Sequence, residues 1–326
     1  MVSETVDSLA TPARQRAAVF CPTPFLTVTI EDVSGSPDIH IHAGGQGVWV
    51  GRMLRALGVR PVLCMPCGGE TGRLLGPLLE AESLAVRAVE AAGQTAAYVH
   101  DRTGGERNVI ATTEPPPLGR HEADQLYTAM LEAAARADVA VLCGPASEGV
   151  LPEDTYRRLP ADLHALGTPI VADLSGAVLR DALSAGVDVL KVSHEELLAD
   201  GWACDESTPQ LVTAMERLHR AGAAAVVVSR AHEPALALIE GRLLSVHGPV
   251  LQRVDHRGAG DSMTAGLAAG VTRGVAWTQA LRLGAAAGAL NVTRHGLATG
   301  ERAAVDALAE RVEVASLDAG VRRGPR

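Results

Sequence analysis

Two different hydrophobic patterns divide the chain. Near the N-terminus, the segments LTVTIEDV and DIHIHA alternate apolar and polar residues, which is the period of half-exposed antiparallel strands. The segment AAYVHDRTGGERNVIATT repeats this alternation on both sides of Gly104-Gly105, which predicts a hairpin turn. We therefore expect a small accessory sheet made of strands at about residues 26–43 and 96–113.

From about residue 118 the pattern changes. Helical stretches such as HEADQLYTAMLEAAARA alternate with continuous apolar strands such as VAVLCG, PIVADLS, VDVLKVS and AAAVVVSR. This alternation predicts a three-layer α/β/α fold, with a mainly parallel sheet that carries helices on both faces. Ligands of such sheets bind beyond the carboxyl ends of the strands. The positions to inspect are therefore Gly144, Asp173–Gly176, Lys191–Glu196 and Ser229-Arg230.

Composition adds limits on partners and location. A net charge of −9 argues against a nucleic-acid or anionic-membrane surface. No run of about 18 apolar residues is present, and the five cysteines are an odd number, as expected for reduced thiols in the cytoplasm. The pair Cys64 and Cys67 has no second metal half-site, so we interpret it as structural. We expect a flexible tail over residues 1–16 and one domain over 17–326.

The strongest local signal for chemistry is DHRGAGDSMTAGLAAGV. A strand-like stretch leads into Gly258-Ala259-Gly260, and a helix is expected from Ser262. Backbone amides at such a helix start form an anion site, and Asp261 beside them could take a proton from a substrate hydroxyl. Together these are the parts of a phosphoryl-transfer site. The alternative is a tight turn followed by an ordinary helix-start aspartate.

Two other nucleotide-binding motifs fit this chain poorly. The loop comes late in the sequence, whereas the glycine motif of a dinucleotide-binding fold follows an early strand and has an acidic residue about 20 positions on. An NAD-dependent oxidoreductase is therefore disfavoured. The sequence contains no GxxxxGKS or GxxxxGKT, which excludes a P-loop.

A series of motifs resembles one known family. The segments GGQGVWVGRMLRALG, GGETG, DLSG, KVSHEEL, VVVSRAHEPAL and GAGDSMTAG follow the order and spacing of the ribokinase-like (PfkB) carbohydrate kinases, nearest the phosphofructokinase and tagatose-6-phosphate kinase branch. The resemblance covers about residues 18–300. It implies a ribokinase-like fold with a β-sheet lid, and ATP- and Mg²⁺-dependent phosphorylation of a sugar or sugar phosphate. It also implies a homodimer formed through the lid.

The resemblance assigns roles to particular residues. It makes Asp261 the catalytic base and the loop amides the anion hole, formed by Gly258, Ala259 and Gly260. Glu196 is its acid that organises Mg²⁺, through water as that ion prefers. The nucleotide side would be contacted by Lys191, Ser229, Arg230 and Gly296. The phosphate acceptor would be contacted by Phe25, Gly44, Gly45, Gln46, Trp49 and Arg107.

Several of these positions depart from the family pattern. Phe25 stands where the family has an aspartate that binds sugar hydroxyls, and a phenyl ring accepts no such hydrogen bond. Gln46 replaces a lysine, Trp49 an asparagine, and Ser193 another asparagine. The hairpin arginine of the family falls on Glu106 or Arg107. These changes leave an alternative open, a non-catalytic relative that binds a ligand for sensing or regulation.

Overall fold

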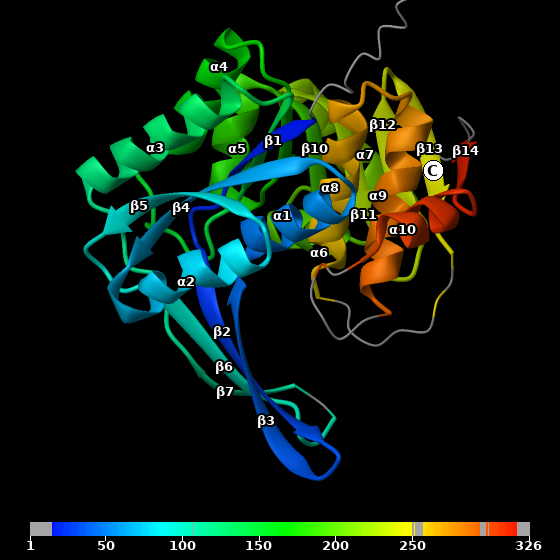
Figure 1. Cartoon of the computed structure of the whole chain (residues 1–326). Coiled ribbons are helices and arrows are strands. Elements are labelled where there is room, and N and C mark those ends of the chain that lie inside the picture. Colours follow the sequence, from blue (N-terminus) through cyan, green and yellow to red (C-terminus); the bar gives the residue numbers. More distant parts are fainter. Residues whose placement is uncertain are drawn as a thin grey trace, which may run out of the picture.

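We analysed a computed structural model of the chain, which describes residues 15–105, 107–249, 251, 257–293, 298 and 300–317 (Figure 1). Residues 1–14, most of the expected N-terminal tail, lie outside this range. The described strands form two separate sheets, one large and one small. No described helix is long and apolar enough to cross a membrane.

The large sheet contains ten of the described strands, in the order β14-β13-β12-β11-β10-β9-β8-β1-β4-β5. The strands from β5 to β11 in this order run parallel, and β12, β13 and β14 add antiparallel pairs at one side. The strands are β1 (Arg16–Phe20), β4 (Arg60–Gly68), β5 (Ala85–Ala91), β8 (Val139–Cys143), β9 (Ile170–Asp173), β10 (Val187–Ser193), β11 (Ala223–Ser229), β12 (Ala235–Ile239), β13 (Arg242–His247) and β14 (Glu313–Ser316).

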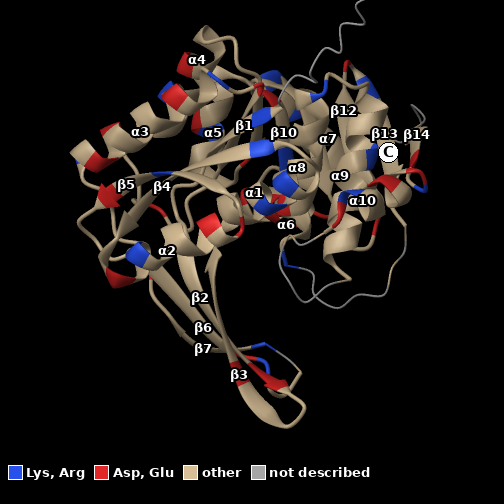
Figure 2. Cartoon of the chain, in the orientation of Figure 1, with Lys and Arg blue, Asp and Glu red and all other residues tan. Residues whose placement is uncertain are grey.

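Helices cover both faces of this sheet because successive strand residues point to opposite sides. Val19 of β1 joins one hydrophobic cluster, packed with α1, α2, α8, α9 and α10, whereas Ala18 and Phe20 join a second cluster with α3 to α7. The helices are α1 (Gln46–Ala56), α2 (Gly69–Ala81), α3 (Arg120–Ala134), α4 (Thr155–Ala165), α5 (Gly176–Ala185), α6 (His194–Ala199), α7 (Thr208–Ala221), α8 (Ala259–Thr272), α9 (Trp277–Asn291) and α10 (Arg302–Ala309). Acidic and basic residues are intermixed on the outer helices (Figure 2).

Helices α8 and α9 cross at unusually short range. A Cβ placed on Gly266 would lie 2.6 Å from the Cα of Gly284 on the facing helix. Helix α8 is also buried along most of its length, from Ser262 to Gly270. The N-terminus of α8 is therefore held at a fixed position relative to the sheet.

The small sheet projects from the main body (Figure 1). Its described strands have the order β3-β2-β6-β7, with bounds β2 (Phe25–Val33), β3 (Ser36–Gly44), β6 (Ala96–Asp101) and β7 (Asn108–Thr112). Alternate residues make one face polar and the other apolar, because Thr27 pairs with His42 while Val28 pairs with Ile41. The predicted fold, a mainly parallel α/β/α body with a small extra sheet, is confirmed.

Candidate active site

The carboxyl ends of β8, β9 and β10 lie side by side at one edge of the large sheet. Cys143 pairs with Asp173, and Asp173 pairs with Lys191. Helix α8 contacts all three strands and begins beside these ends. This is the edge at which the sequence pattern predicts a ligand site.

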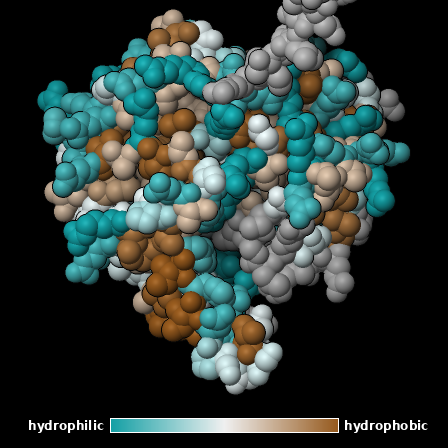
Figure 3. Space-filling view, viewed as in Figure 1, coloured by the Kyte–Doolittle hydropathy of each residue, from teal (hydrophilic) through white to brown (hydrophobic). Residues whose placement is uncertain are grey.

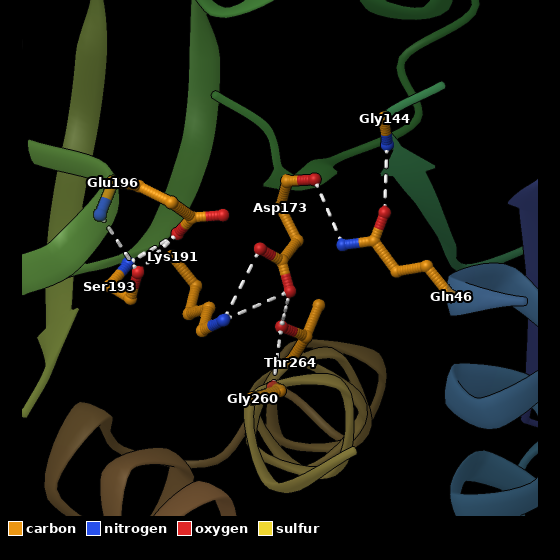
Figure 4. Close-up of polar contacts among 8 residues, drawn as sticks. All are labelled: Gln46, Gly144, Asp173, Lys191, Ser193, Glu196, Gly260 and Thr264. Carbon is orange, nitrogen blue, oxygen red and sulfur yellow. Dashed lines mark hydrogen bonds and ion pairs between the residues drawn. The ribbon is translucent and has the colours of Figure 1, made fainter. Parts of the chain in front are cut away.

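Asp173 is the centre of a buried polar network (Figure 4). Its side chain is 2% exposed, and its carboxylate accepts hydrogen bonds from Lys191 Nζ at 3.2 and 3.3 Å. The hydroxyl of Thr264 on α8 donates a third hydrogen bond to Asp173 at 2.7 Å. The network therefore joins β9, β10 and α8 through a charged pair that has little contact with water.

Asp261 lies in the first turn of α8, as expected. The helix begins at Ala259, three residues before the predicted Ser262, because Gly258 adopts φ 73° and serves as the N-cap. Gly258 has no side chain with which to cap the helix, so the first amides are left for another partner. Burial, and then the nearby Asp173 carboxylate, raise the pKa of Asp261 to about 7.

Lys191 is 5% exposed and lies next to the same helix start. Burial lowers the pKa of its ammonium group, but the carboxylates of Asp173, Glu196 and Asp261 together outweigh burial and raise it. A Cβ on Gly260 would lie 2.6 Å from Lys191 Nζ, so a larger residue there would require the ammonium group to shift. A fixed positive charge therefore borders the amides of the helix start.

We expect Gly260→Ala to lower turnover by about 10- to 100-fold, because the new methyl group would push Lys191 out of position. The matched control is Gly76→Ala on α2, where a Cβ would meet nothing within 4 Å. The control is expected to keep full turnover and to gain slightly in thermal stability. Equal turnover of the two variants would show that the position of Lys191 does not matter.

Glu196 is held by the start of α6. One of its carboxylate oxygens accepts hydrogen bonds from both the amide and the hydroxyl of Ser193, each at 2.7 Å, and Ser193 Oγ in turn accepts one from the Glu196 amide at 3.1 Å. Ser193 therefore orients the carboxylate. No group of three His, Cys, Asp or Glu side chains among the described residues is placed to hold a metal ion.

Of the other residues expected on the nucleotide side, Ser229 pairs with Ser193 at the end of the neighbouring strand. Ser229 ends β11, and its neighbour Arg230 points its guanidinium toward the start of α7, where it donates to Thr208 Oγ1 at 3.4 Å and to the Glu206 carbonyl at 3.3 Å. Gly296 lies outside the described residues, so its expected nucleotide contact has no structural counterpart here.

The glycine loop before α1 packs against the segment that carries Thr23 and Phe25. A Cβ on Gly44 would lie 2.5 Å from the Phe25 ring, and Gly45 combines φ 110° with a close approach to the Thr23 carbonyl. Gln46, expected to face the acceptor, accepts a hydrogen bond from the Gly144 amide at 2.9 Å and donates one to the Asp173 carbonyl at 3.3 Å. Gln46 thus links α1 to the ends of β8 and β9 (Figure 4).

A cavity of about 830 Å³ lies between the polar face of the small sheet and α1. Phe25, Trp49 and Arg107, three residues expected to contact the acceptor, line it. Arg257, which directly precedes the N-cap of α8, also lines it and donates to the Tyr98 hydroxyl at 3.3 Å. The described lining of the cavity therefore includes the small sheet, α1 and the residue just before α8.

A sequence profile described as pfkB family carbohydrate kinase matches residues 25–304. The chain belongs to this family. The match includes the glycine loop, the β9 and β10 ends and the Asp261 loop, so the pfkB resemblance found in the motifs is confirmed, and with it the assignment to the carbohydrate kinases.

The names of the relatives agree with this assignment, and a solved structure agrees in fold. The 1-phosphofructokinase of Bacillus subtilis (strain 168) is 29% identical over 263 residues, which is 80% of this chain and 84% of the relative. The ATP-dependent 6-phosphofructokinase isozyme 2 of Mycobacterium tuberculosis (strain CDC 1551 / Oshkosh) is 31% identical over 79% of this chain and 76% of its own. Escherichia coli phosphofructokinase-2, in a crystal structure with fructose-6-phosphate, has a TM-score of 0.76 and 23% identity and covers 91% of this chain and 99% of its own.

Several residues of the pfkB site were not assigned from the sequence. Asp173 was singled out as a strand end, and DLSG as a family motif, but neither reveals that its carboxylate pairs with Lys191. Thr264 and Tyr98 gave no signal, because a threonine in a helix and a tyrosine in a strand are unremarkable residues. Only the fold brings Thr264 together with Asp173, and Tyr98 together with Phe25.

Proposed function

We propose that the protein transfers the terminal phosphoryl group of ATP to a hydroxyl of a sugar phosphate. The observation that carries this proposal is the start of α8, where Asp261, with a pKa raised to about 7, stands beside amides that have no side-chain cap and beside the buried Lys191. A general base works best when its pKa is near the working pH. The family membership and the names of the relatives support the same reaction.

Each part of the site has a defined task in this reaction. The Asp261 carboxylate would accept the proton of the acceptor hydroxyl while the hydroxyl oxygen forms its bond to the transferred phosphorus. The bond between that phosphorus and the bridging oxygen of ATP breaks, and ADP leaves with the electron pair. The amides at Gly258, Ala259 and Gly260 hold the negative charge that builds up nearby. Lys191 adds a fixed positive charge, which Asp173 keeps in place through two hydrogen bonds.

The residues present fit ATP and Mg²⁺. Bound Mg²⁺ would neutralise charge on the phosphates, and it commonly uses one or two carboxylates together with water and phosphate oxygens. Glu196, oriented by Ser193, would supply one such carboxylate. Lys191, Ser229 and Arg230 stay our candidates for the nucleotide side.

Release of ADP tests the proposal directly. The purified protein is incubated with ATP and Mg²⁺ and a panel of sugars, sugar phosphates and nucleosides, and ADP is measured for each acceptor. We expect ADP release that requires both Mg²⁺ and one class of acceptor. ATP hydrolysis at the same low rate with every acceptor would contradict the proposal.

A non-catalytic binding role is the second candidate, favoured by Phe25 and Trp49 in place of residues that bind sugar hydroxyls. In that case ATP or an acceptor would bind, with binding detected by a thermal shift, but no acceptor in the panel would be phosphorylated. Phosphorylation of any panel member rules this candidate out. The intact Gly258–Asp261 segment makes catalysis our first choice.

We also propose that the small sheet acts as a lid over the acceptor and pairs with the same sheet of a second copy. Its apolar face leaves Ile39, Ile41 and Ile110 exposed by 62%, 49% and 55%. Figure 3 shows hydrophobic side chains gathered on this part of the molecule. Exposed apolar surface of this kind favours association.

Light scattering during size-exclusion chromatography tests this pairing. We expect the parent protein to elute with the mass of a dimer and Ile39→Lys with the mass of a monomer, because a charge at the centre of an apolar interface is costly to bury. The matched control, Leu166→Lys, makes the same kind of change at an exposed apolar residue at the end of α4. This variant is expected to stay dimeric. A dimeric Ile39→Lys variant would place the interface elsewhere.

A further inference from the structure

The cavity beside α1 is lined by a large share of the few aromatic side chains in this sequence. The whole sequence contains three Trp, three Tyr and two Phe, and three of these eight residues line this one cavity. They are Phe25, Trp49 and Tyr98, which come from β2, α1 and β6. Three separate elements thus contribute to one group of aromatic residues, which we call the aromatic wall.

These rings contact one another at their edges and keep part of their surface open. The Phe25 and Trp49 ring centres are 5.7 Å apart at an interplanar angle of 83°, and the Phe25 and Tyr98 centres are 6.4 Å apart. All three side chains are only partly buried, and about 830 Å³ of cavity remains beside them. The aromatic residues therefore border the cavity without filling it, and they offer π-surface to a ligand.

The same cavity is positively charged although the protein is acidic. Its described lining includes Arg52, Arg55, Arg102, Arg107 and Arg257 against Glu31 and Glu82, a difference of three positive charges. Arg52 binds Glu82 through two hydrogen bonds, at 2.5 and 2.6 Å, and Glu31 is 3.9 Å from Arg102. An arginine-rich lining of this kind suits a phosphate ester, because a guanidinium group is positively charged and can donate two parallel hydrogen bonds to two phosphate oxygens.

Two lining side chains, Trp49 and His100, have a buried nitrogen without a hydrogen-bond partner in the described structure. His100 is 2% exposed, its Nε2 is 3.2 Å from the Thr29 hydroxyl, and its Nδ1 is buried without a hydrogen-bond partner in the described structure. Burial, and then Arg107, lower the pKa of His100 to about 4, so its imidazole is neutral at pH 7. A buried neutral imidazole with a free nitrogen is suited to a neutral polar group of a ligand.

We infer that the acceptor is a sugar phosphate that carries a planar aromatic ring, as in a nucleoside 5′-monophosphate. The ring would lie against Phe25, Trp49 and Tyr98, and the phosphate would lie among the arginines. Arg257 lines this cavity and directly precedes Gly258, the N-cap of α8, so the sugar would lie between the ring and Asp261. This inference rests on the proposed function, since it names the acceptor class of the same site.

Calorimetry with matched ligands tests the inference without requiring turnover. The donor site is first filled with Mg²⁺ and the β,γ-methylene analogue of ATP, so that added nucleotide meets only the acceptor cavity. Uridine and adenosine 5′-monophosphates carry both the aromatic ring and the phosphate. Uridine and adenosine carry the ring without a phosphate, and fructose 1- and 6-phosphates carry a phosphate without an aromatic ring. We expect at least one monophosphate to bind tenfold or more tightly than its nucleoside and than either fructose phosphate. A fructose phosphate that binds as tightly as the monophosphates would overturn the inference.

Variants show whether the aromatic wall is responsible. Phe25→Leu and Trp49→Leu keep an apolar side chain without a π-face, and each is expected to weaken monophosphate binding by about tenfold, as loss of ring stacking does. Trp202→Leu, a partly buried tryptophan outside the cavity, is the matched control and is expected to bind unchanged. The double variant Phe25→Asp with Trp49→Asn is expected to favour fructose phosphates. Unchanged monophosphate binding in both single leucine variants would refute the role of the wall.

Failure of this inference and failure of the kinase proposal give different results. If monophosphates bind in a way that depends on Phe25 but ADP is never released, the aromatic site stands and the phosphoryl-transfer proposal falls. If a fructose phosphate is phosphorylated and the monophosphates do not bind, the kinase proposal stands and the aromatic acceptor is wrong.

Discussion

Asp261→Asn should reduce turnover by at least about 100-fold and leave ATP affinity within about twofold of the parent. The amide side chain has nearly the same shape as the carboxylate but cannot accept a proton, and general-base catalysis is typically worth 10²- to 10⁴-fold. The measurement is steady-state ADP release with the best acceptor of the panel, together with calorimetric titration of ATP. Asp306→Asn, on the exposed face of α10, is the control and should keep full turnover.

The pH dependence gives a second signature of the same residue. Only the ionised carboxylate accepts a proton, so the parent's turnover should rise as pH increases through about 7, while the residual rate of Asp261→Asn should not follow this curve. Because the folded-state pKa lies above the ordinary value of 3.8, the stability contributed by protonated Asp261 is lost as pH rises from about 4 to above 7. The melting temperature of Asp261→Asn should therefore rise relative to that of the parent protein as pH increases from 5 to 8. A parent profile without a step near pH 7 would remove Asp261 from the role of base.

Lys191→Met should lower the free energy of unfolding by about 3–5 kcal/mol, the usual result of leaving one member of a buried ion pair without its partner. Asp173 is 2% exposed, so its carboxylate cannot turn to water when the ammonium group is removed. Urea unfolding followed by circular dichroism measures the change. Thr264→Val, which removes a single hydrogen bond to the same carboxylate, should cost only about 1–2 kcal/mol.

The double variant Asp173→Asn with Lys191→Met separates the ion pair from simple loss of packing. Removing both charges leaves no uncompensated charge in the interior, so the double variant should be more stable than Lys191→Met alone. Turnover should stay low in both variants, because the positive charge beside the Gly258 loop is absent. A double variant that is less stable than either single variant would mean that the pair does not act as a unit.

The fold and the position of the Gly258 loop at a helix start could be predicted from the sequence because they rest on local patterns. The period-2 alternation around Gly104 and the apolar strands between helices are properties of short segments, and Gly258 to Asp261 form a contiguous motif. The expected start of α8 at Ser262 is three residues too late. A left-handed glycine at its N-cap moved the start to Ala259, and nothing in the residue order shows which glycine takes that conformation.

The arrangement around the site could not be predicted, because it depends on residues far apart in the sequence. The position of Gln46 suggested an acceptor contact, yet both ends of its amide bind backbone atoms of β8 and β9, about 100 residues and more away. Trp49 and Phe25 were recognised as departures from the family pattern, but the third ring, Tyr98, joins them only through the parallel pairing of β2 with β6. A pairing between two separate hairpins leaves no trace in either segment alone.

The close crossing of α8 and α9 at Gly266 and Gly284 also bears on how such a protein can acquire a new substrate. Asp261, our proposed base, sits on a helix that is buried along most of its length, whereas the proposed acceptor wall is carried largely by hairpin strands with one side exposed. Substitutions in the hairpins can therefore reshape the acceptor site while the reaction chemistry stays untouched. The architecture separates what is phosphorylated from how it is phosphorylated, and lets the two change at different rates.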